Sequence, residues 1–260
     1  MCGIVGYIGK YDTTKILLDG LKELEYRGYD SAGIAVLHGN EIDVFKAVGK
    51  LVNLEEKVNQ NNKDRYNLGI GHTRWATHGK PTEVNAHPHL GEYSYVVHNG
   101  IIKNYKELKD ELTSLGHNFV SQTDTEVIVH LFEHYNNKLN DAKKAFQETI
   151  KRLEGAYAIL LITKKDPEKI FFYKLGSPMI VGHGIEKDEV LFASSDSALI
   201  GLANDVVYLD DKIGELLQEM VSSFLVKILF GQNFQLQNSL LKKMVLDTLW
   251  KKRFMSKVLL

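Results

Sequence analysis

Cys2 is the only cysteine in this chain of 260 residues, and it directly follows the opening methionine. If Met1 is removed, one residue carries both a nucleophilic thiol and a free α-amine, whose pKa is ordinarily about 7.7 to 8.0. Such an amine can serve as the general base for its own thiol near neutral pH, an arrangement that suits acyl transfer. A small buried thiol in a first strand would explain the same position without any chemistry. The rest of the sequence has to decide between these interpretations.

A thiolate that attacks an amide carbonyl creates an oxyanion, which needs hydrogen-bond donors fixed beside it. The tripeptide His98-Asn99-Gly100 follows an apolar stretch that ends at Val97. It offers a side-chain amide and a glycine N–H that another group can approach closely. Asn-Gly is also a common turn, so the tripeptide alone is weak support for an oxyanion hole.

Two charged residues are candidates for holding a substrate that carries both charges. Arg74 lies in the stretch GHTRWATHG beside Trp75, Thr77 and His78, and its planar guanidinium can grip a carboxylate. Asp124, in SQTDTE at the start of an expected helix, can pair with an ammonium group. An ordinary surface salt bridge and a favourable helix-dipole contact are the alternative interpretations.

The histidines do not predict a metal site. No closed ligand pattern and no completing carboxylate or cysteine accompanies the histidines at 72, 78, 87, 89 and 98. Neither G-x-x-x-x-G-K-[ST] nor a helix-opening G-x-G-x-x-G occurs, so no phosphate-binding loop is expected. We therefore expect neither a metal nor a cofactor.

The elements that must position these residues follow from the hydrophobic pattern. Apolar residues at helical spacing predict helices capped by Asp12, Asn104 and Thr123, and a weaker helix is expected to end near Leu153. Short β-prone runs between turn residues predict strands at 3–8, 32–37, 42–48, 66–70, 93–97, 157–162, 170–173, 179–181 and 190–193. Strands that come in runs and helices that come in a cluster favour an α+β fold over a doubly wound parallel sheet.

Composition excludes some classes of function. The formal net charge is −1, which gives no broad electropositive face for nucleic acid or acidic lipid. No apolar run approaches the roughly 20 residues needed to span a bilayer, and no secretory signal opens the chain. We expect a cytoplasmic protein that acts on a small molecule and binds neither nucleic acid nor membrane.

Several motifs together resemble one enzyme family. In order along the chain they are CGIVGY, LEYRGYDSAGIAV, GHTRWATHG, AHPH, HNGII and SQTDTE. They resemble the glutaminase half of the glutamine:fructose-6-phosphate amidotransferases, which make glucosamine 6-phosphate. Sister families that also begin with cysteine carry different residues where this chain has EYRGYDSAG and HTRWATHG. The resemblance covers Met1 to about Gly214.

The resemblance implies a class II glutamine amidotransferase with the four-layer αββα sandwich of the N-terminal-nucleophile (Ntn) hydrolases. It implies that Cys2 is the nucleophile and that Asn99 and Gly100 form the oxyanion hole. It also implies that the glutamine pocket includes Arg74 for the α-carboxylate, Asp124 for the α-ammonium, and Trp75, Thr77 and His78.

A second set of implications concerns the partner half. Arg27 and Tyr29 match a loop that the resemblance links to sensing the sugar phosphate and to communication between the two halves. Fructose 6-phosphate would bind only to a sugar-isomerase half. Because the dimer contacts are expected mainly in that half, we expect this chain to be a monomer.

The resemblance ends before the chain does. We expect an amidotransferase domain at residues 1–216, an atypical tail at 217–260, and no sugar-isomerase domains. With free codon choice, residues 243–256 read one nucleotide earlier can encode KDGFRYFMEKEIYE, which is similar to the family's junction between its halves. The tail is therefore interpreted as a frameshifted sequence. A genuine short helical tail is the competing interpretation.

Three hypotheses on function remain open at this stage. The first is glutamine hydrolysis through a Cys2 thioester. The second is a catalytically silent fragment that keeps only a glutamine-binding pocket. The third, an amide hydrolase for another substrate, is disfavoured because Arg74 and Asp124 offer two charges that match a free α-amino acid.

Overall fold

Two antiparallel sheets form the centre of the protein. The computed structural model describes residues 2–61, 66–75, 79–185 and 189–211. Within these residues one sheet has the strand order β11-β9-β10-β1-β4-β2-β3 and the other the order β5-β6-β7-β8. The strands are β1 (Gly3–Ile8), β2 (Ser31–His38), β3 (Glu41–Val48), β4 (Leu68–Arg74), β5 (His89–Leu90), β6 (Ser94–Ile102), β7 (Gly155–Thr163), β8 (Phe171–Leu175), β9 (Ile180–Gly184), β10 (Val190–Ala193) and β11 (Ala203–Tyr208).

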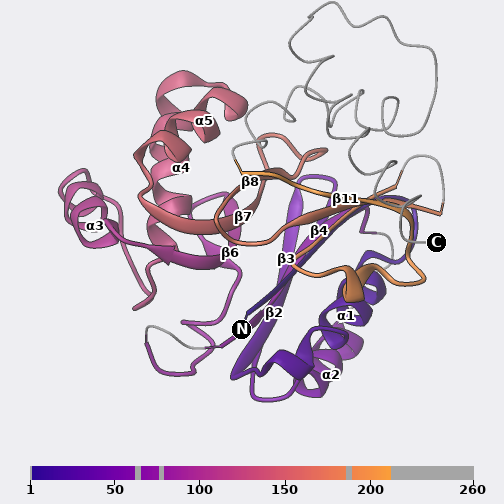
Figure 1. Ribbon diagram of the computed structural model, residues 1–260. Coiled ribbons are helices and arrows are strands. Elements are labelled where there is room, and N and C mark those ends of the chain that lie inside the picture. Colours follow the sequence, from indigo (N-terminus) through magenta and orange to yellow (C-terminus); the bar gives the residue numbers. More distant parts are fainter. Residues whose placement is uncertain (1, 62–65, 76–78, 186–188, 212–260) are drawn as a thin grey trace, which may run out of the picture. The chain divides into compact units, whose positions relative to one another are not determined.

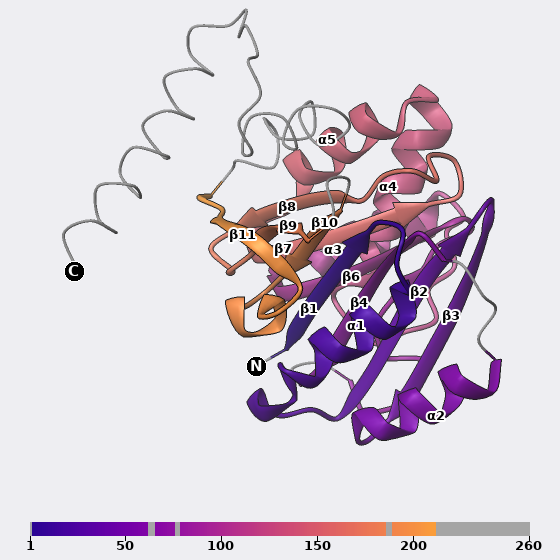
Figure 2. The same cartoon turned by 90° about the vertical axis from the view of Figure 1, so that its right-hand side faces the viewer.

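Helices cover the outer face of each sheet (Figures 1 and 2). Helices α1 (Thr13–Lys22) and α2 (Leu51–Asn61) pack against the larger sheet, where their apolar faces share one core with β1, β2 and β3. Helices α3 (Tyr105–Ser114), α4 (Glu126–Leu139) and α5 (Ala142–Arg152) share a second core with β6, β7 and β8. The inner faces of the sheets pack together, for example through Phe172 and Phe192, whose rings lie 5.0 Å apart. This arrangement confirms the predicted four-layer αββα sandwich.

Strand β4 shows how the sequence assigns side chains to the two faces of the larger sheet. A Cβ at Gly71 would lie 3.1 Å from Leu21 of α1, and one at Gly69 would lie 2.8 Å from Leu17. These glycines let α1 approach the sheet closely. Because side chains alternate along a strand, His72 and Arg74 point to the opposite face, toward the second sheet. The two polar residues of β4 are therefore placed between the sheets.

Most of the predicted elements are confirmed, but β4 and β6 continue to Arg74 and Ile102, beyond their predicted ends at residues 70 and 97. The hairpin of β2 and β3 turns at Gly39-Asn40, and Asp12 caps α1 by accepting a hydrogen bond from Lys15 N at 3.1 Å. Strands β5 and β11 were not predicted. Helix α2 was not predicted either, although its buried face has an apolar pattern.

One predicted cap is confirmed in position only, and another is wrong. Asn104 is the N-cap residue of α3, but its side chain makes no cap hydrogen bond; it bonds to Arg152 O at 2.8 Å and to Glu154 N at 3.1 Å. Helix α4 has Thr125 at its N-cap, and Thr123 lies outside the helix. The Thr123 hydroxyl bonds to a histidine ring instead, so tertiary partners compete successfully for these side chains.

Some predictions fall on residues that the structure does not describe. These residues include Met1, Thr77, His78 and the whole tail at 217–260 with its proposed boundary at 216. In the part of the chain that is described, no helix combines the length and apolar character needed to cross a membrane.

Candidate active site

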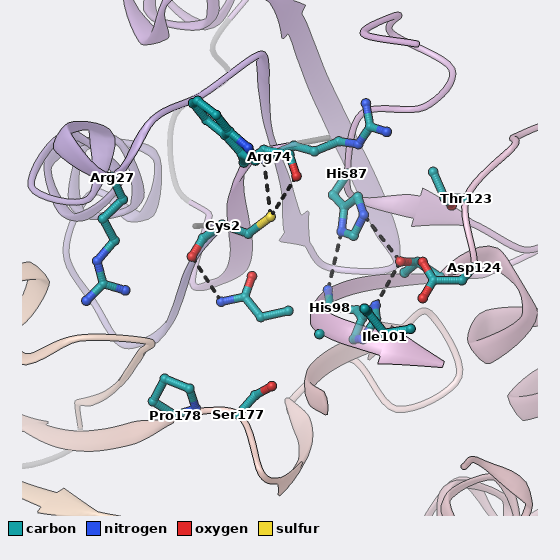
Figure 3. A pocket seen from close by; sticks show the side chains of 14 residues that line it. Cys2, Arg27, Arg74, His87, His98, Ile101, Thr123, Asp124, Ser177 and Pro178 are labelled. Carbon is teal, nitrogen blue, oxygen red and sulfur yellow. Dashed lines mark hydrogen bonds between the residues drawn. The ribbon is translucent and has the colours of Figure 1, made fainter. Parts of the chain in front are cut away.

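A cavity of about 420 Å³ opens where the ends of β1 and β4 meet β6 of the other sheet (Figure 3). Cys2 directly precedes β1 and Arg74 ends β4 of the larger sheet, while Asn99 comes from β6 and Asp124 from the segment before α4. The full lining consists of Cys2, Arg27, Arg74, Trp75, His87, His98, Asn99, Gly100, Ile101, Thr123, Asp124, Thr125, Ser177 and Pro178. The cavity thus brings together residues that lie more than a hundred positions apart in the chain.

The Cys2 thiol is held by the backbone of Trp75. The Trp75 N–H donates to Sγ at 3.2 Å, and the thiol lies 3.5 Å from Trp75 O, to which it can donate. Burial raises the pKa of the Cys2 thiol above its usual value. The thiol is therefore protonated near neutral pH and needs a base to become a nucleophile. An α-amine on the same residue would supply that base if Met1 were removed.

Asn99 presents its amide toward Cys2. Its Nδ2 donates to Cys2 O at 3.3 Å, and its Oδ1 lies 3.1 Å from His72 Nε2. Asn99 itself is 8% exposed, so the amide is largely shielded from water. This geometry places a hydrogen-bond donor on the side of the cavity that faces the thiol.

Gly100 is required by the backbone at this point. Its φ of +126° is a conformation that L side chains rarely adopt, and a Cβ there would lie 2.0 Å from Ala156 O of the neighbouring strand. Any other residue at position 100 would push β6 away from β7. The Asn-Gly pair is therefore part of a strand, which excludes the alternative interpretation of a turn.

Arg74 is 3% exposed and reaches the segment that follows β4. Its Nη2 donates to Gly79 O at 3.1 Å, and its Nη1 lies 3.4 Å from both Lys80 O and Asp30 Oδ1. The residue is buried, which excludes an ordinary surface salt bridge. A buried guanidinium at a cavity wall is well suited to bind a carboxylate.

Asp124 is also buried, with 5% of its surface exposed. Its Oδ2 accepts a hydrogen bond from the Ile102 N–H at 2.8 Å. This bond to the end of β6 fixes the carboxylate at the cavity wall. A cation bound in the cavity would meet this negative charge.

Four of the five histidines considered for metal binding lie together beside the cavity, and His78 is outside the described residues. Rings 72 and 87 stack at 4.0 Å, and rings 87 and 89 meet edge to face at 4.6 Å. Burial lowers the pKa of His72 to about 3 and of His98 to about 4, and it lowers the pKa of His87 and His89 well below the usual value. These rings are neutral and bond mainly to threonine hydroxyls and backbone groups.

Most of the predicted site residues line this cavity together: Cys2, Arg27, Arg74, Trp75, Asn99, Gly100 and Asp124. Tyr29 is half-buried nearby and is not among the lining residues of the described chain. The sequence interpretation missed Ser177 and Pro178, which the turn between β8 and β9 brings to the cavity, and it also missed Thr125. No motif marks the turn, so its position is known only from the fold.

Comparison with known proteins identifies the type of domain. Residues 72–201 match the family described as "Glutamine amidotransferase domain". The match covers half of the chain and includes Arg74, Asn99 and Asp124. The chain belongs to the glutamine amidotransferase domain family.

Relatives of this amidotransferase domain extend well beyond it. The glutamine–fructose-6-phosphate aminotransferase (isomerizing) of Campylobacter jejuni is 59% identical over 211 residues, which is 81% of this chain and 35% of that protein. The protein of the same name from Helicobacter pylori is 52% identical over 217 residues, with 83% and 36% covered. The chain therefore spans about a third of the length of the curated relatives it matches.

Solved structures show the same fold as the amidotransferase domain. The glutamine phosphoribosylpyrophosphate amidotransferase of B. subtilis matches with a TM-score of 0.66 and 27% identity, covering 80% of this chain and 44% of that one. A class-II domain protein from Silicibacter pomeroyi matches with a TM-score of 0.55 at 16% identity, covering 81% of this chain and 92% of that one. The expected Ntn-hydrolase type of αββα sandwich is thus confirmed.

Proposed function

We propose that this amidotransferase domain hydrolyses L-glutamine to glutamate and ammonia through a thioester on Cys2. The observation that carries the proposal is the convergence of a thiol, an amide donor and two buried opposite charges on one cavity. The family match and the aminotransferase relatives support the same chemistry.

The free α-amine of a processed Cys2 would take the thiol proton in the first step. Sγ then attacks the carboxamide carbon of glutamine, and the oxyanion that forms accepts hydrogen bonds from Asn99 Nδ2 and the Gly100 N–H. The C–N bond breaks as the amine returns the proton to the leaving nitrogen, which departs as ammonia. Water then attacks the thioester, and its proton passes by way of the amine to Sγ as glutamate is released.

The two charges on the cavity wall would orient the substrate. Arg74 would bind the α-carboxylate and Asp124 the α-ammonium, with Trp75, Thr77 and His78 completing the pocket. A substrate held at both charges presents its carboxamide to the thiol in a single orientation, which lowers the entropy cost of the attack. The pairing also selects a free α-amino acid over an amide within a peptide.

We further propose that the ammonia serves the synthesis of glucosamine 6-phosphate in the hexosamine pathway. The relatives are named as fructose-6-phosphate aminotransferases, and this chain matches only about a third of their length. The sugar would bind to an isomerase half. Arg27 lines the cavity and lies beside Tyr29, so this segment would carry the signal between the halves. We also predict that this fragment is a monomer and that it is cytoplasmic.

Intact mass and product assays test the proposal directly. The purified chain is weighed before and after treatment with 6-diazo-5-oxo-norleucine, an electrophile that mimics glutamine, and glutamate release is assayed in parallel. We expect a chain without Met1, one covalent adduct at Cys2, and glutamate and ammonia in equal amounts. Cys2→Ala is the control and should lose both the adduct and the activity.

An unreactive thiol and no glutamate from the wild-type chain would contradict the proposal. The silent glutamine-binding fragment would then be the better interpretation, and equilibrium binding of glutamine would test it.

The origin of the tail at 217–260 needs a separate test, because it lies outside the described residues. We propose that the amidotransferase domain ends near residue 216 and that a shifted reading frame follows. Genomic DNA from related strains decides the point: an uninterrupted in-frame match to this tail would contradict the frameshift.

A further inference from the structure

His72 lies directly behind the Asn99 amide, between the two sheets. Its ring is fully buried, and its Nε2 lies 3.1 Å from Asn99 Oδ1 and 3.1 Å from the backbone oxygen of His98. Both neighbours are acceptors, so Nε2 must carry the hydrogen and donate to them. The His98 carbonyl cannot act as a donor, and it therefore fixes this tautomer of the ring.

The fixed tautomer in turn fixes the orientation of the Asn99 side chain. An amide has one accepting and one donating end, and a rotation by 180° about its last bond exchanges them. In the exchanged orientation the NH₂ group would face the His72 Nε2–H, and two donors would oppose each other. The observed orientation avoids this and leaves Asn99 Nδ2 to donate toward Cys2, whose carbonyl oxygen lies 3.3 Å away.

The His72 ring is held in place by a second buried histidine. It stacks on His87 with ring centroids 4.0 Å apart and an angle of 14° between the planes. His87 Nδ1 accepts from the backbone N–H of His98 at 3.3 Å, so its Nε2 donates to Thr125 Oγ1, also at 3.3 Å. The Thr125 hydroxyl also lies 2.9 Å from His98 Nδ1. The backbone N–H of His98 thus fixes the tautomer of His87 and the direction of its two hydrogen bonds.

We propose that His72 is a positioning residue, whose Nε2–H orients the Asn99 amide so that Nδ2 stabilises the oxyanion formed on the substrate. This inference rests on the proposed glutamine hydrolysis. His72 touches Asn99 and not the cavity itself, since it is not among the described residues that line the cavity. Its contribution is therefore expected in the step where the oxyanion forms, with little effect on how tightly glutamine binds.

A purely structural role is the competing explanation, and substitutions of similar size separate the two. His72→Met fills the space without a donor, whereas His72→Gln keeps an N–H near the position of Nε2. His89→Met and His89→Gln are the matched controls. His89 is buried in the same group and meets His87 edge to face, but its Nε2 lies 3.0 Å from Thr123 Oγ1.

Steady-state kinetics of the full chain provide the first measurement. For His72→Met we expect kcat to fall roughly 30- to 300-fold with KM within about 3-fold, because an oxyanion-hole donor is worth roughly 100- to 1,000-fold and is only disordered here. His72→Gln keeps a donor, so its kcat should be at least about 5-fold higher than that of His72→Met. The His89 variants should keep kcat within about 3-fold of the wild type, since they leave the donor untouched.

Alkylation of Cys2 by iodoacetamide is the internal control, because this displacement forms no oxyanion. Its rate should stay within about 3-fold in His72→Met, in contrast to the loss of kcat. A parallel loss of alkylation would show a general disturbance of the cavity and would overturn the proposal. Equal kcat in His72→Met and the wild type, or equal losses in the matched His72 and His89 variants, would overturn it as well.

Nitrogen NMR of the wild-type chain tests the proposal without any variant or activity. With ¹⁵N-labelled histidine we expect His72 to be protonated at Nε2 and bare at Nδ1 at pH 7. The opposite tautomer would overturn the proposal even if every variant failed to fold. If the wild-type chain released no glutamate, the proposed function would fail, and the tautomer would still show separately whether His72 orients the amide.

Discussion

The two walls of the cavity are built in different ways. The thiol side consists of Cys2, Arg74 and Trp75, and the amide side consists of Asn99, Gly100 and Asp124. On the thiol side, the Cys2 thiol and the Arg74 guanidinium are held mostly by backbone atoms of residues 75, 79 and 80. These hydrogen bonds are 3.1 to 3.5 Å long. The Trp75 side chain is 52% exposed and lies against Gly28 at the surface.

The amide side is held by buried groups within the sandwich. The Asp124 carboxylate accepts from the Ile102 N–H at 2.8 Å, and the Asn99 amide lies 3.1 Å from a fully buried histidine. Preorganised donors that need no rearrangement stabilise a developing charge well. In the proposed reaction the amide side would therefore hold the oxyanion-hole donor in a fixed position, and the thiol side would adjust to the substrate.

The largest expected difference between the sides is in the response to an added methyl group. Gly100→Ala and Gly28→Ala both place alanine at positive φ, but only the first meets the backbone, with Ala156 O 2.0 Å from the new Cβ. The Gly28 methyl would meet the end of the Trp75 ring at 2.1 Å, and this exposed side chain can move aside. Gly100→Ala should lower the free energy of unfolding by about 2 to 5 kcal/mol.

Urea unfolding of both variants measures this difference. We expect Gly28→Ala to lose about 1 to 3 kcal/mol less than Gly100→Ala, because backbone strain is common to both and the steric clash is not. Equal losses would contradict the view that the amide side is the more rigid wall.

Removal of the Asn99 amide tests the oxyanion hole itself. Asn99→Ala should lower kcat for glutamine hydrolysis roughly 100- to 1,000-fold with KM nearly unchanged, because the donor acts on charge that develops in the transition state. Steady-state glutamate release measures both constants. A rise in KM at constant kcat would instead assign Asn99 to substrate binding.

Asp124 allows a test of substrate recognition with a matched ligand. Asp124→Asn keeps an oxygen for the Ile102 N–H and removes the charge, so it should raise KM for glutamine about 10- to 100-fold, as expected for loss of a charged hydrogen bond. The substrate analogue 4-carbamoylbutanoate lacks the α-ammonium, and its hydrolysis should be nearly the same in both proteins. An equal loss for both substrates would show that Asp124 does not bind the ammonium.

The sequence was informative where chemistry and local pattern coincide. Cys2, Arg74, Asn99 and Asp124 stand in short motifs, and short β-prone runs between turn residues predicted most of the segments that form the sheets. The histidine group was not predicted as a hydrogen-bonded set, because its members come from separate elements and only the folded chain shows their partners. The failure at Thr123 has the same origin, since its hydroxyl bonds to a distant ring. Helix α2 did carry a signal in its buried leucines, which the prediction overlooked.

The smallest expected effect is a pH dependence of stability, which comes from the buried histidine rings behind the amide side. Burial lowers the pKa of His72 to about 3 and of His98 to about 4, against an ordinary value of 6.5 in the unfolded chain. Below pH 6.5 the unfolded chain binds protons that the folded chain does not, so stability is complete above this pH and falls as the pH decreases. Between pH 7.5 and 5.5 each of these rings should cost about 1 kcal/mol, and Tm should fall by about 2 to 4 °C per ring.

Thermal unfolding across this pH range measures the effect, and one variant assigns it. His89→Gln removes another buried ring whose pKa is lowered, so the slope of Tm against pH should become flatter. Because carboxylates titrate mainly below this range, a Tm that stays constant from pH 7.5 to 5.5 would mean that the histidines accept protons in the folded state. The amide side would then lack the neutral rings on which its rigidity depends.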